Sequence, residues 1–174
     1  MLVNGASGGV GTFAVQIAKS FGARVTGVCS TRNLDLVHSL GADRVIDYTR
    51  EDFTTGSDRY DIVLDCHASR PLRACAGILA PNGSYIIVGA PGGGLIGPLR
   101  AAVKAFVLAP FVRRTLTMMT AKPNHDDLAL VADLMKTGAV TPVIDRSYRL
   151  DEVPNAIRYL EQGHARGKVV ITVA

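Results

Sequence analysis

The sequence is poor in cysteine and has no long apolar run, and both shortages exclude whole classes of protein. It holds three cysteines, Cys29, Cys66 and Cys75, without a C-x-x-C pair, so we expect neither a disulfide framework nor a metal site. No window approaches the roughly 18 uninterrupted apolar residues of a membrane span, and no basic segment precedes an apolar one at the N-terminus. These absences predict a cytoplasmic location and no membrane partner.

Basic residues outnumber acidic ones, but they are scattered. The net charge of +4 could suit an anionic partner, yet no basic stretch is interleaved with aromatic residues, so nucleic acid is not expected as a partner. With 48% hydrophobic and 20% charged residues, the composition is that of a globular protein. A chain of 174 residues suits one domain with an appendage.

Short apolar runs rich in β-branched residues alternate with helical patterns along most of the chain. This alternation predicts an α/β fold in which helices cover a parallel sheet, that is, a doubly wound Rossmann sheet. The strand-like runs are Met1–Asn4, Arg24–Cys29, Arg44–Asp47, Asp61–Asp65, Ser84–Gly89 and Leu116–Ala121.

Helical patterns fill the gaps between these runs. In the first, an apolar face formed by Val10, Phe13, Ala14, Ile17 and Ala18 has helical spacing, and a glycine, Gly22, is expected to end the helix. Further helices are expected at Asn33–Leu40 before Gly41, at Pro71–Leu79 before the Pro81-Asn82-Gly83 turn, and at Asp126–Lys136 before Gly138.

Two segments do not fit the alternation. The region Gly92–Arg114 predicts a basic amphipathic helix that covers a pocket or a subunit contact, with a membrane surface as the alternative. After the sixth strand, Pro142–Tyr148 and Lys168–Val173 are strand-like, and the Leu150–Gln162 helix between them is capped by Asp151 or a neighbour. We therefore expect a Rossmann domain at 1–139 and a C-terminal strand-helix-strand appendage at 140–174.

The stretch NGASGGVGTF, from Asn4 to Phe13, places four glycines between the first strand and the first helix. Ala6, Gly8 and Gly11 have the spacing of G-x-G-x-x-G, and a strand before it and a helix after it are the context that supports a dinucleotide site. Small residues there let the backbone approach a pyrophosphate, and the helix N-terminus favours its charge. A tight turn without a ligand is the alternative. The predicted cofactor-binding residues of this stretch are Ala6, Ser7, Gly8, Gly9, Val10 and Gly11.

The end of the second strand lacks the carboxylate that binds the ribose 2′-hydroxyl in NAD sites. It reads Cys29-Ser30-Thr31-Arg32-Asn33, and its hydroxyls and guanidinium can hold a 2′-phosphate through charge-assisted hydrogen bonds. One such bond corresponds to a preference for NADP over NAD of roughly 10- to 150-fold. Ser30, Arg32 and Asn33 are therefore predicted cofactor-binding residues. In the alternative, Arg32 is a solvated surface charge and Cys29 a core thiol.

Several ordered motifs together resemble one family across essentially the whole chain. The motifs are VNGASGGVGTFAVQIAKSFGARVTGVCSTRN, SLGADRVIDY, YDIVLD, GSYIIVGAPGGG and GHARGKVVITV. They resemble the zinc-independent, quinone-oxidoreductase-like branch of the medium-chain dehydrogenase/reductase superfamily. The resemblance implies NADPH as cofactor and a quinone or an activated enone or carbonyl as substrate. It also implies that Tyr48 contacts the 2′-phosphate and that Gly89, Ala90 and Pro91 lie beside the nicotinamide.

The sequence departs from this family at two places. Relatives often carry lysine where this chain has Asn33, so recognition of the 2′-phosphate would rest on Arg32 and Ser30. Relatives also begin with an N-terminal catalytic domain, whereas this sequence begins at the first Rossmann strand. In them the segment matching 140–174 completes that domain, so we expect the appendage to lack its usual partner and the activity of this chain alone to be doubtful.

No catalytic side chain is predicted, because hydride transfer is the chemistry of the cofactor and the protein supplies placement. His67 follows Asp65 at the end of the fourth strand, where a doubly wound sheet binds ligands. Asp65 is a predicted cofactor-binding residue. His67 could face the ribose or donate a proton, and a solvated loop histidine is the alternative. A short-chain dehydrogenase is excluded, because no tyrosine is followed four residues later by lysine.

Two functions remain open at this stage. The first is the NADPH-binding portion of an oxidoreductase that transfers hydride to a quinone or an activated enone. The second is a non-catalytic NADPH-binding or interaction module without a substrate domain. The resemblance further implies a homodimer that pairs the Leu116–Ala121 strand across a two-fold axis, which would also cover an exposed sheet edge.

Overall fold

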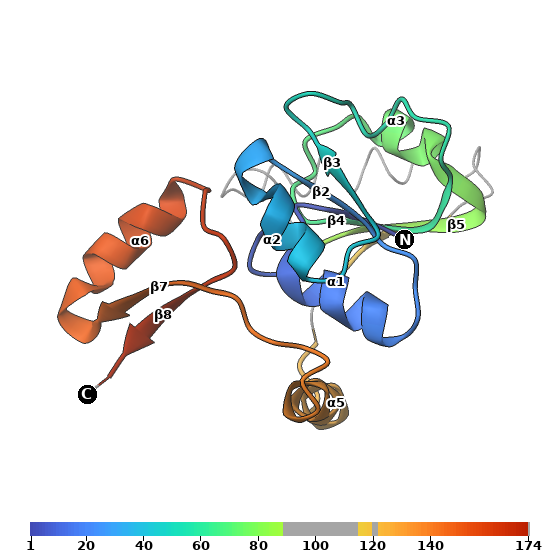
Figure 1. Cartoon of the computed structure of the whole chain (residues 1–174). Coiled ribbons are helices and arrows are strands. Elements are labelled where there is room, and N and C mark those ends of the chain that lie inside the picture. The colour runs from blue at the N-terminus through green and yellow to red at the C-terminus, as the bar shows by residue number, and fades with distance from the viewer. Residues whose placement is uncertain (89–114, 120–121, 174) are drawn as a thin grey trace.

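A six-stranded parallel sheet forms the body of the protein (Figure 1). The computed structural model describes residues 1–88, 115–119 and 122–173. Its strand order is β3-β2-β1-β4-β5-β6, and the predicted α/β doubly wound fold is confirmed. The strands are β1 (Leu2–Asn4), β2 (Thr26–Cys29), β3 (Arg44–Asp47), β4 (Tyr60–Asp65), β5 (Leu79–Ile87) and β6 (Thr115–Met118).

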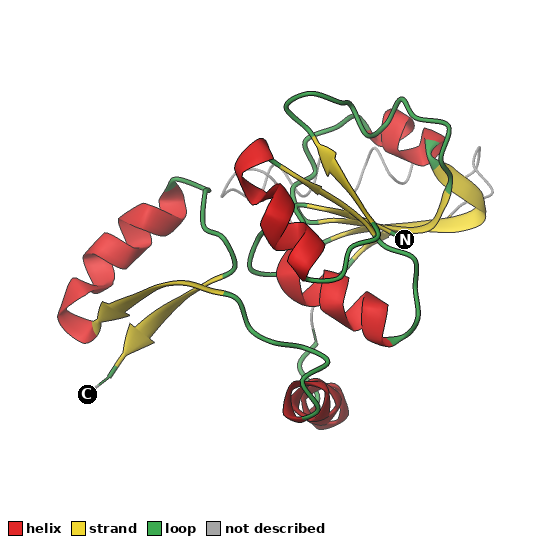
Figure 2. Ribbon diagram, in the orientation of Figure 1, coloured by secondary structure: helices red, strands yellow, loops and turns green. Residues whose placement is uncertain are grey.

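Helices join these strands along the chain (Figure 2). Three of them end beside a glycine with positive φ, as the sequence predicts: Gly22 (φ +74°), Gly41 (φ +95°) and Gly138 (φ +76°). Such a conformation costs an L side chain energy, and glycine adopts it freely. The helices are α1 (Gly11–Ser20), η1 (Thr31–Asn33), α2 (Leu34–Ser39), α3 (Leu72–Gly77) and α5 (His125–Lys136).

The strand order reverses at β1, and this reversal positions the site. Strand β1 pairs on one side with β2 and on the other with β4, so that Asn4 lies opposite Val28 and Asp65. The connections on the two sides of β1 therefore run in opposite directions, which leaves a crevice at the carboxyl ends of these strands. The glycine-rich stretch follows β1 directly and begins at this crevice.

Two apolar clusters bury the two faces of the sheet. Leu2 and Val3 are neighbours in β1 with no exposed surface, and each belongs to a different cluster, because successive side chains of a strand point to opposite faces. Leu2 packs with Tyr60, Val63, Ile78, Leu79 and Tyr85, among others. Val3 packs with residues of α1 and α2, including Val15, Ala18 and Val37. Burial on both faces is what a parallel sheet requires.

The predicted apolar face of α1 is wrong in detail. The buried residues are Gly11, Thr12, Val15, Gln16 and Ala18, whereas Val10 is 46% exposed and Phe13 is half-buried. Close packing on the preceding turn selects small residues: a Cβ on Gly11 would lie 2.1 Å from the Gly5 carbonyl oxygen. The spacing of apolar residues in the sequence does not reveal this requirement for small residues.

Two other boundaries differ from the expectation. The Pro81-Asn82-Gly83 turn lies inside β5, where the pairing with β4 shifts register between Tyr60 and Ile62, and Asn82 has a φ of +64°. Strand β5 therefore begins at Leu79, before the predicted turn. The Gly92–Arg114 helix and the Gly89, Ala90 and Pro91 predictions lie outside the described residues, as does the end of the predicted Leu116–Ala121 strand.

The C-terminal residues form a second, smaller unit (Figure 1). Strands β7 (Ile144–Arg149) and β8 (Lys168–Thr172) pair in parallel with each other in a sheet of their own. Between them lie η3 (Leu150–Glu152) and α6 (Val153–Glu161). The Glu152 carboxylate accepts the backbone N–H of Arg149 at 3.0 Å, so a neighbour of Asp151 caps this helical segment. The strand-helix-strand pattern predicted for this region is confirmed.

Across the described part of the chain, no helix combines the length and the apolar character needed to cross a membrane.

Candidate cofactor site

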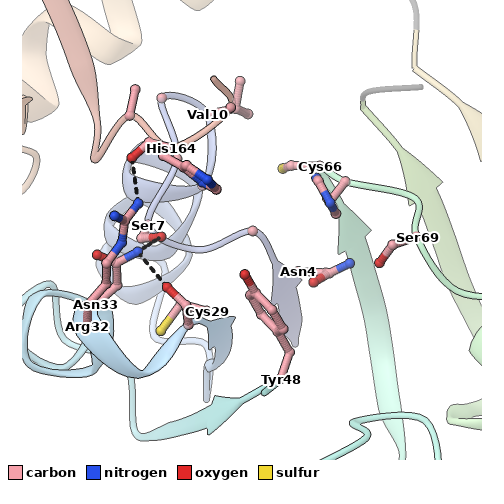
Figure 3. A pocket seen from close by; sticks show the side chains of 18 of the residues that line it. Asn4, Ser7, Val10, Cys29, Arg32, Asn33, Tyr48, Cys66, Ser69 and His164 are labelled. Atoms are coloured by element: carbon pink, nitrogen blue, oxygen red, sulfur yellow. Dashed lines mark hydrogen bonds between the residues drawn. The ribbon is translucent and has the colours of Figure 1, made fainter. Parts of the chain in front are cut away.

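A cavity of about 500 Å³ lies at the carboxyl ends of β1, β2 and β4. Its walls come from the glycine-rich turn, the end of β2, the loop after β4 and a short segment of the C-terminal unit (Figure 3). Residues of the turn that line it are Asn4, Gly5, Ser7, Gly8, Gly9, Val10 and Gly11; the others are Cys29, Ser30, Arg32, Asn33, Tyr48, Phe53, Cys66, His67, Ser69, Arg70, Gly163, His164 and Ala165.

The glycine-rich turn is folded back against β2. The backbone N–H groups of Gly5 and Ala6 both donate to the Val28 carbonyl oxygen, at 3.1 and 3.0 Å, and Gly8 N–H donates to the Gly5 carbonyl oxygen. Gly5 has a φ of +80°, so glycine is needed there. The N-terminus of α1 follows at the cavity wall, where its dipole and backbone N–H groups favour an anion.

The end of β2 brings hydroxyl, amide and guanidinium groups to the same cavity. Asn33 Nδ2 donates to Ser7 Oγ at 2.9 Å and to Ser30 Oγ at 3.2 Å. Arg32 Nη2 donates to the His164 carbonyl oxygen at 2.9 Å (Figure 3). Tyr48, which is 50% exposed, extends from the turn after β3 toward this region. The predicted 2′-phosphate residues are thus brought together.

Asp65 lies beneath the cavity rather than on its wall. Its carboxylate has no exposed surface and accepts hydrogen bonds from Asn4 Nδ2 at 2.8 Å and from the backbone N–H groups of His67 and Ala68 at 3.0 and 2.7 Å. Tyr85 Oη donates to it at 2.5 Å, and burial together with this carboxylate raises the pKa of Tyr85 far above its usual value. Asp65 therefore holds Asn4 and the 66–68 turn in place.

The remaining predicted residues divide into those that line the cavity and those that do not. Ser7 to Gly11, Ser30, Arg32, Asn33 and Tyr48 line it, and so does His67. Ala6 is fully buried against the sheet and does not line it. Sequence reasoning missed Cys66, Ser69, Arg70 and the 163–165 segment. The last is marked in the sequence by Gly163 and Gly167, which both adopt positive φ.

The two thiols at the cavity are not activated. Burial raises the pKa of the Cys66 thiol to about 11, and the Asp65 carboxylate adds to the shift. Burial, followed by Asp47, raises the pKa of the Cys29 thiol to about 11 as well. Both are therefore protonated at neutral pH and are poor nucleophiles. Among the described residues, no group of three or more histidine, cysteine or acidic side chains could hold a metal ion.

Backbone and side-chain hydrogen bonds attach the C-terminal unit to the turn and to α1. Gly167 N–H donates to the Ser7 carbonyl oxygen at 2.9 Å. The Gln16 amide donates to the Thr141 carbonyl oxygen at 3.0 Å and accepts the Thr141 N–H at 2.8 Å. Together with the Arg32 contact to His164, these bonds place the 163–165 segment at the cavity.

Comparisons with known proteins agree with this geometry. A family model described as zinc-binding dehydrogenase matches residues 40–171. The chain belongs to the zinc-binding dehydrogenase family. The chain is 35% identical over 192 residues to the mitochondrial NAD(P)H oxidoreductase RTN4IP1 of Mus musculus, and the match covers 99% of this chain and 47% of that protein. It is 34% identical over 175 residues to the chloroplast envelope quinone oxidoreductase homolog of Arabidopsis thaliana, with 98% and 51% covered.

A solved structure supports the same family assignment for this chain. The quinone oxidoreductase from Coxiella burnetii superimposes with a TM-score of 0.84 at 28% identity, and the match covers 99% of this chain and 52% of that one. The resemblance to quinone oxidoreductases of the medium-chain dehydrogenase/reductase superfamily is thus confirmed. The chain spans about half the length of the curated relatives that it matches.

Proposed function

We propose that this chain is the NADPH-binding portion of an oxidoreductase that transfers hydride to a quinone or an activated enone. The proposal rests on the cavity and on two of the segments that line it. One is the glycine-rich turn at the N-terminus of α1, and the other is the end of β2, which has no carboxylate. Relatives named NAD(P)H oxidoreductase and quinone oxidoreductase support a nicotinamide cofactor and this substrate class. They do not separate NADPH from NADH, so that choice rests on the residues of the cavity.

The side chains at the end of β2 favour a 2′-phosphate over a 2′-hydroxyl. Arg32 has five N–H donors; one is used by the His164 carbonyl oxygen, and the others meet no acceptor among the described residues. That one bond holds the guanidinium in place while it keeps donors for an anion. The carboxylate of Asp47, at the end of β3, does not line the cavity. It accepts hydrogen bonds from Thr31 and Thr49 instead. The described residues that line the cavity include no carboxylate that would repel a phosphate there.

The proposed roles follow from the positions of the residues. The turn from Ser7 to Gly11 and the N-terminus of α1 bind the pyrophosphate through backbone N–H groups. Ser30 and Arg32 bind the 2′-phosphate, and Tyr48 borders it. Asp65 orients Asn4 through the 2.8 Å hydrogen bond to its Nδ2. A bound nicotinamide cofactor supplies the hydride, and no side chain of this chain is proposed as an acid, base or nucleophile.

The second candidate is a module that binds NADPH without turning a substrate over. It is favoured by the chemistry of the cavity: burial raises the pKa of both thiols that line it, Cys29 and Cys66, to about 11, and no side chain that lines it is proposed as an acid, base or nucleophile. Steady-state oxidation of NADPH with a panel of quinones and enones separates the two candidates. Turnover by the purified 174-residue chain supports the oxidoreductase, and binding without turnover supports the module.

Calorimetric titration with NADPH and with NADH tests the cofactor assignment. We expect tighter binding of NADPH and, for Arg32→Ala, a loss of NADPH affinity of at least about tenfold, which corresponds to one charge-assisted hydrogen bond. Arg73→Ala is the matched control, because Arg73 is exposed on α3 and does not line the cavity. Equal affinity for the two cofactors, or an equal loss in both variants, contradicts the assignment.

A homodimer through the Leu116–Ala121 region is part of the proposal. Strand β6 lies at one edge of the six-stranded sheet, and an edge strand presents backbone groups that a second copy can pair with. Sedimentation should give a dimer at micromolar concentration. A monodisperse monomer would falsify this assembly.

A cytoplasmic location also stays a proposal. No helix of the described residues is long and apolar enough to cross a membrane, while the names of two relatives place them in mitochondria and at the chloroplast envelope. Fractionation of cells that express the protein tests it, and enrichment in an organelle fraction contradicts it.

A further inference from the structure

The side chain of Asn33 is used in an unusual way. Asn33 occupies the N-cap position of α2, where an asparagine side chain typically accepts a backbone N–H from the first turn. Here it makes no such bond. The residue is only 5% exposed, and its amide is turned toward the glycine-rich turn and the end of β2. The residue therefore contributes to the cavity instead of to its own helix.

Both hydrogens of the Asn33 amide are given to serine hydroxyls of the cavity. Nδ2 donates to Ser7 Oγ at 2.9 Å and to Ser30 Oγ at 3.2 Å (Figure 3). A serine hydroxyl has one hydrogen to donate and can accept two. Each oxygen that accepts from Asn33 thus keeps its own hydrogen, which donates to no acceptor among the described residues. Both serines line the cavity, so both hydrogens are available to an acceptor there.

The stability of the fold does not account for this arrangement. Asn33 Oδ1 is buried and has no hydrogen-bond partner among the described residues, and a buried acceptor without a partner is costly. An apolar side chain of similar size would avoid that cost. The amide is therefore better explained by what its two donors do to Ser7 and Ser30.

We propose that Asn33 is a positioning residue that presents the hydroxyl hydrogens of Ser7 and Ser30 to the 2′-phosphate of NADPH. The inference rests on the proposed function and deepens it. Phosphate oxygens only accept hydrogen bonds, and a hydroxyl bonded to an ionised oxygen is roughly twice as strong as a neutral pair. The two fixed donors therefore favour a 2′-phosphate over a 2′-hydroxyl. Arg32 supplies the positive charge beside these two hydroxyls, whereas Asn33 itself is uncharged.

The test compares two fragments of the cofactors, 2′,5′-ADP (adenosine 2′,5′-bisphosphate) and 5′-AMP, which differ only in the 2′-phosphate. The purified 174-residue chain and its variants are titrated with each by calorimetry. For Asn33→Ala we expect about tenfold weaker binding of 2′,5′-ADP, equivalent to one hydrogen bond to a charged group. The affinity for 5′-AMP should stay within about twofold, because the change removes no contact to the rest of the ligand.

Two further variants separate positioning from a structural role. Asn33→Asp puts an acceptor-only carboxylate beside both serines, which attracts their hydrogens and repels the phosphate, so it should weaken 2′,5′-ADP more than Asn33→Ala does. In a Ser7→Ala/Ser30→Ala background, Asn33→Ala should cause no further loss, because the groups through which it acts are gone. Ser39→Ala is the matched control: its hydroxyl donates to the Leu36 carbonyl oxygen within α2, away from the cavity.

The outcomes distinguish this inference from the cofactor assignment. If Asn33→Ala weakens both ligands equally, or its loss persists in the double-serine background, Asn33 is structural and the inference is wrong. If Arg32→Ala removes the preference for 2′,5′-ADP while the Asn33 variants keep it, the inference fails and the NADPH assignment stands. If the unmodified chain does not distinguish the two fragments, the NADPH assignment is wrong, and the inference that rests on it is wrong as well.

Discussion

The six-stranded sheet and the C-terminal unit, β7 to β8, are buried to very different degrees. Every residue of β1 and β2 is buried, whereas none of β7 or β8 is. In α6 only Ala156 is buried. Large apolar side chains of the unit that are exposed include Ile144, Leu150, Ile157, Leu160 and Val173.

This difference separates a part that covers its own core from one that does not. Helices from the sheet's own connections cover both of its faces, whereas α6 packs on one side of a two-stranded sheet (Figure 1). A two-stranded sheet is marginal by itself, and here hydrogen bonds to Ser7, Gln16 and Arg32 attach the unit to the rest. The cavity nevertheless depends on both parts, because residues 163–165 form one of its walls.

Matched leucine truncations test the comparison most directly, with the largest expected effect. Leu79→Ala removes a side chain with no exposed surface and should lower the free energy of unfolding by about 2–5 kcal/mol. Leu160→Ala removes one that is 50% exposed on α6 and should cost no more than about 0.5 kcal/mol. Denaturant unfolding measures both. A comparable loss for Leu160→Ala would break the comparison, since it would mean that α6 is covered.

The packing of the glycine-rich turn provides the next test within the sheet. Gly11→Ala would place a Cβ 2.1 Å from the Gly5 carbonyl oxygen and 2.7 Å from Ala6 Cα, and backbone atoms have little room to move. We expect a loss of about 3 kcal/mol in unfolding free energy, at the upper end of overpacking effects, together with loss of cofactor binding. At Gly8 the same Cβ would meet the Gly5 carbonyl oxygen at 3.4 Å, so Gly8→Ala should be tolerated. Equal stability of the two variants contradicts this packing.

A substitution in the C-terminal unit tests how far the cavity depends on it. Gly167→Ala puts a Cβ 2.3 Å from the Val143 carbonyl oxygen at a φ of +91°, and it should displace the 163–168 segment. We expect about tenfold weaker NADPH binding, equivalent to about 1.4 kcal/mol, with little change in the unfolding of the six-stranded sheet.

Gly138→Ala is the control for this change. Gly138 also has positive φ, +76°, but it does not line the cavity, and no atom lies within 4 Å of its added Cβ. Only the left-handed backbone strain of about 1–2 kcal/mol acts there. If both variants bind NADPH equally well and as tightly as the unmodified chain, the C-terminal wall contributes nothing to the site.

The last test leaves stability and binding unchanged and concerns the chemical reactivity of Cys66 between pH 7 and pH 11. Because burial raises its pKa to about 11, the thiol stays protonated at neutral pH, and its alkylation by iodoacetamide should be slow. The rate should rise about tenfold per pH unit as the thiolate fraction grows and level off only near the pKa. Cys66→Ser identifies the reacting residue by mass spectrometry, and a plateau near pH 8 would contradict the shift.

The fold could be predicted from the sequence because its signals are local. Each strand-like run contains or overlaps the observed strand, and Gly22, Gly41 and Gly138 end helices as expected. The buried face of α1 was wrong because close packing at Gly11 selects size, whereas apolar spacing records only hydrophobicity. The break inside β5 depends on its pairing with β4, which no local pattern contains.

The residues of the candidate site also fall into two groups: those whose positions the sequence predicts, and those that only tertiary contacts bring to the cavity. Ser7 to Gly11 and Ser30 to Asn33 lie next to strand ends that the sequence reveals, so their positions could be predicted. Their cofactor roles stay predictions, as does the role of Asp65. Gly163 to Ala165 were missed, because only tertiary contacts such as the bond between Arg32 and His164 bring them to the cavity. The direction of the Asn33 amide could not be predicted either, since it depends on two serines in the turns that follow different strands.

The bond between Arg32 and the His164 carbonyl joins residues 132 positions apart, and this separation matters during protein synthesis. At about 5–20 residues per second, the ribosome adds His164 about 7 to 26 seconds after Arg32. The strands β1 to β5 can therefore pair before the last wall of the cavity exists. If the chain binds NADPH as proposed, full affinity is therefore reached only after the C-terminal unit has been translated and has docked.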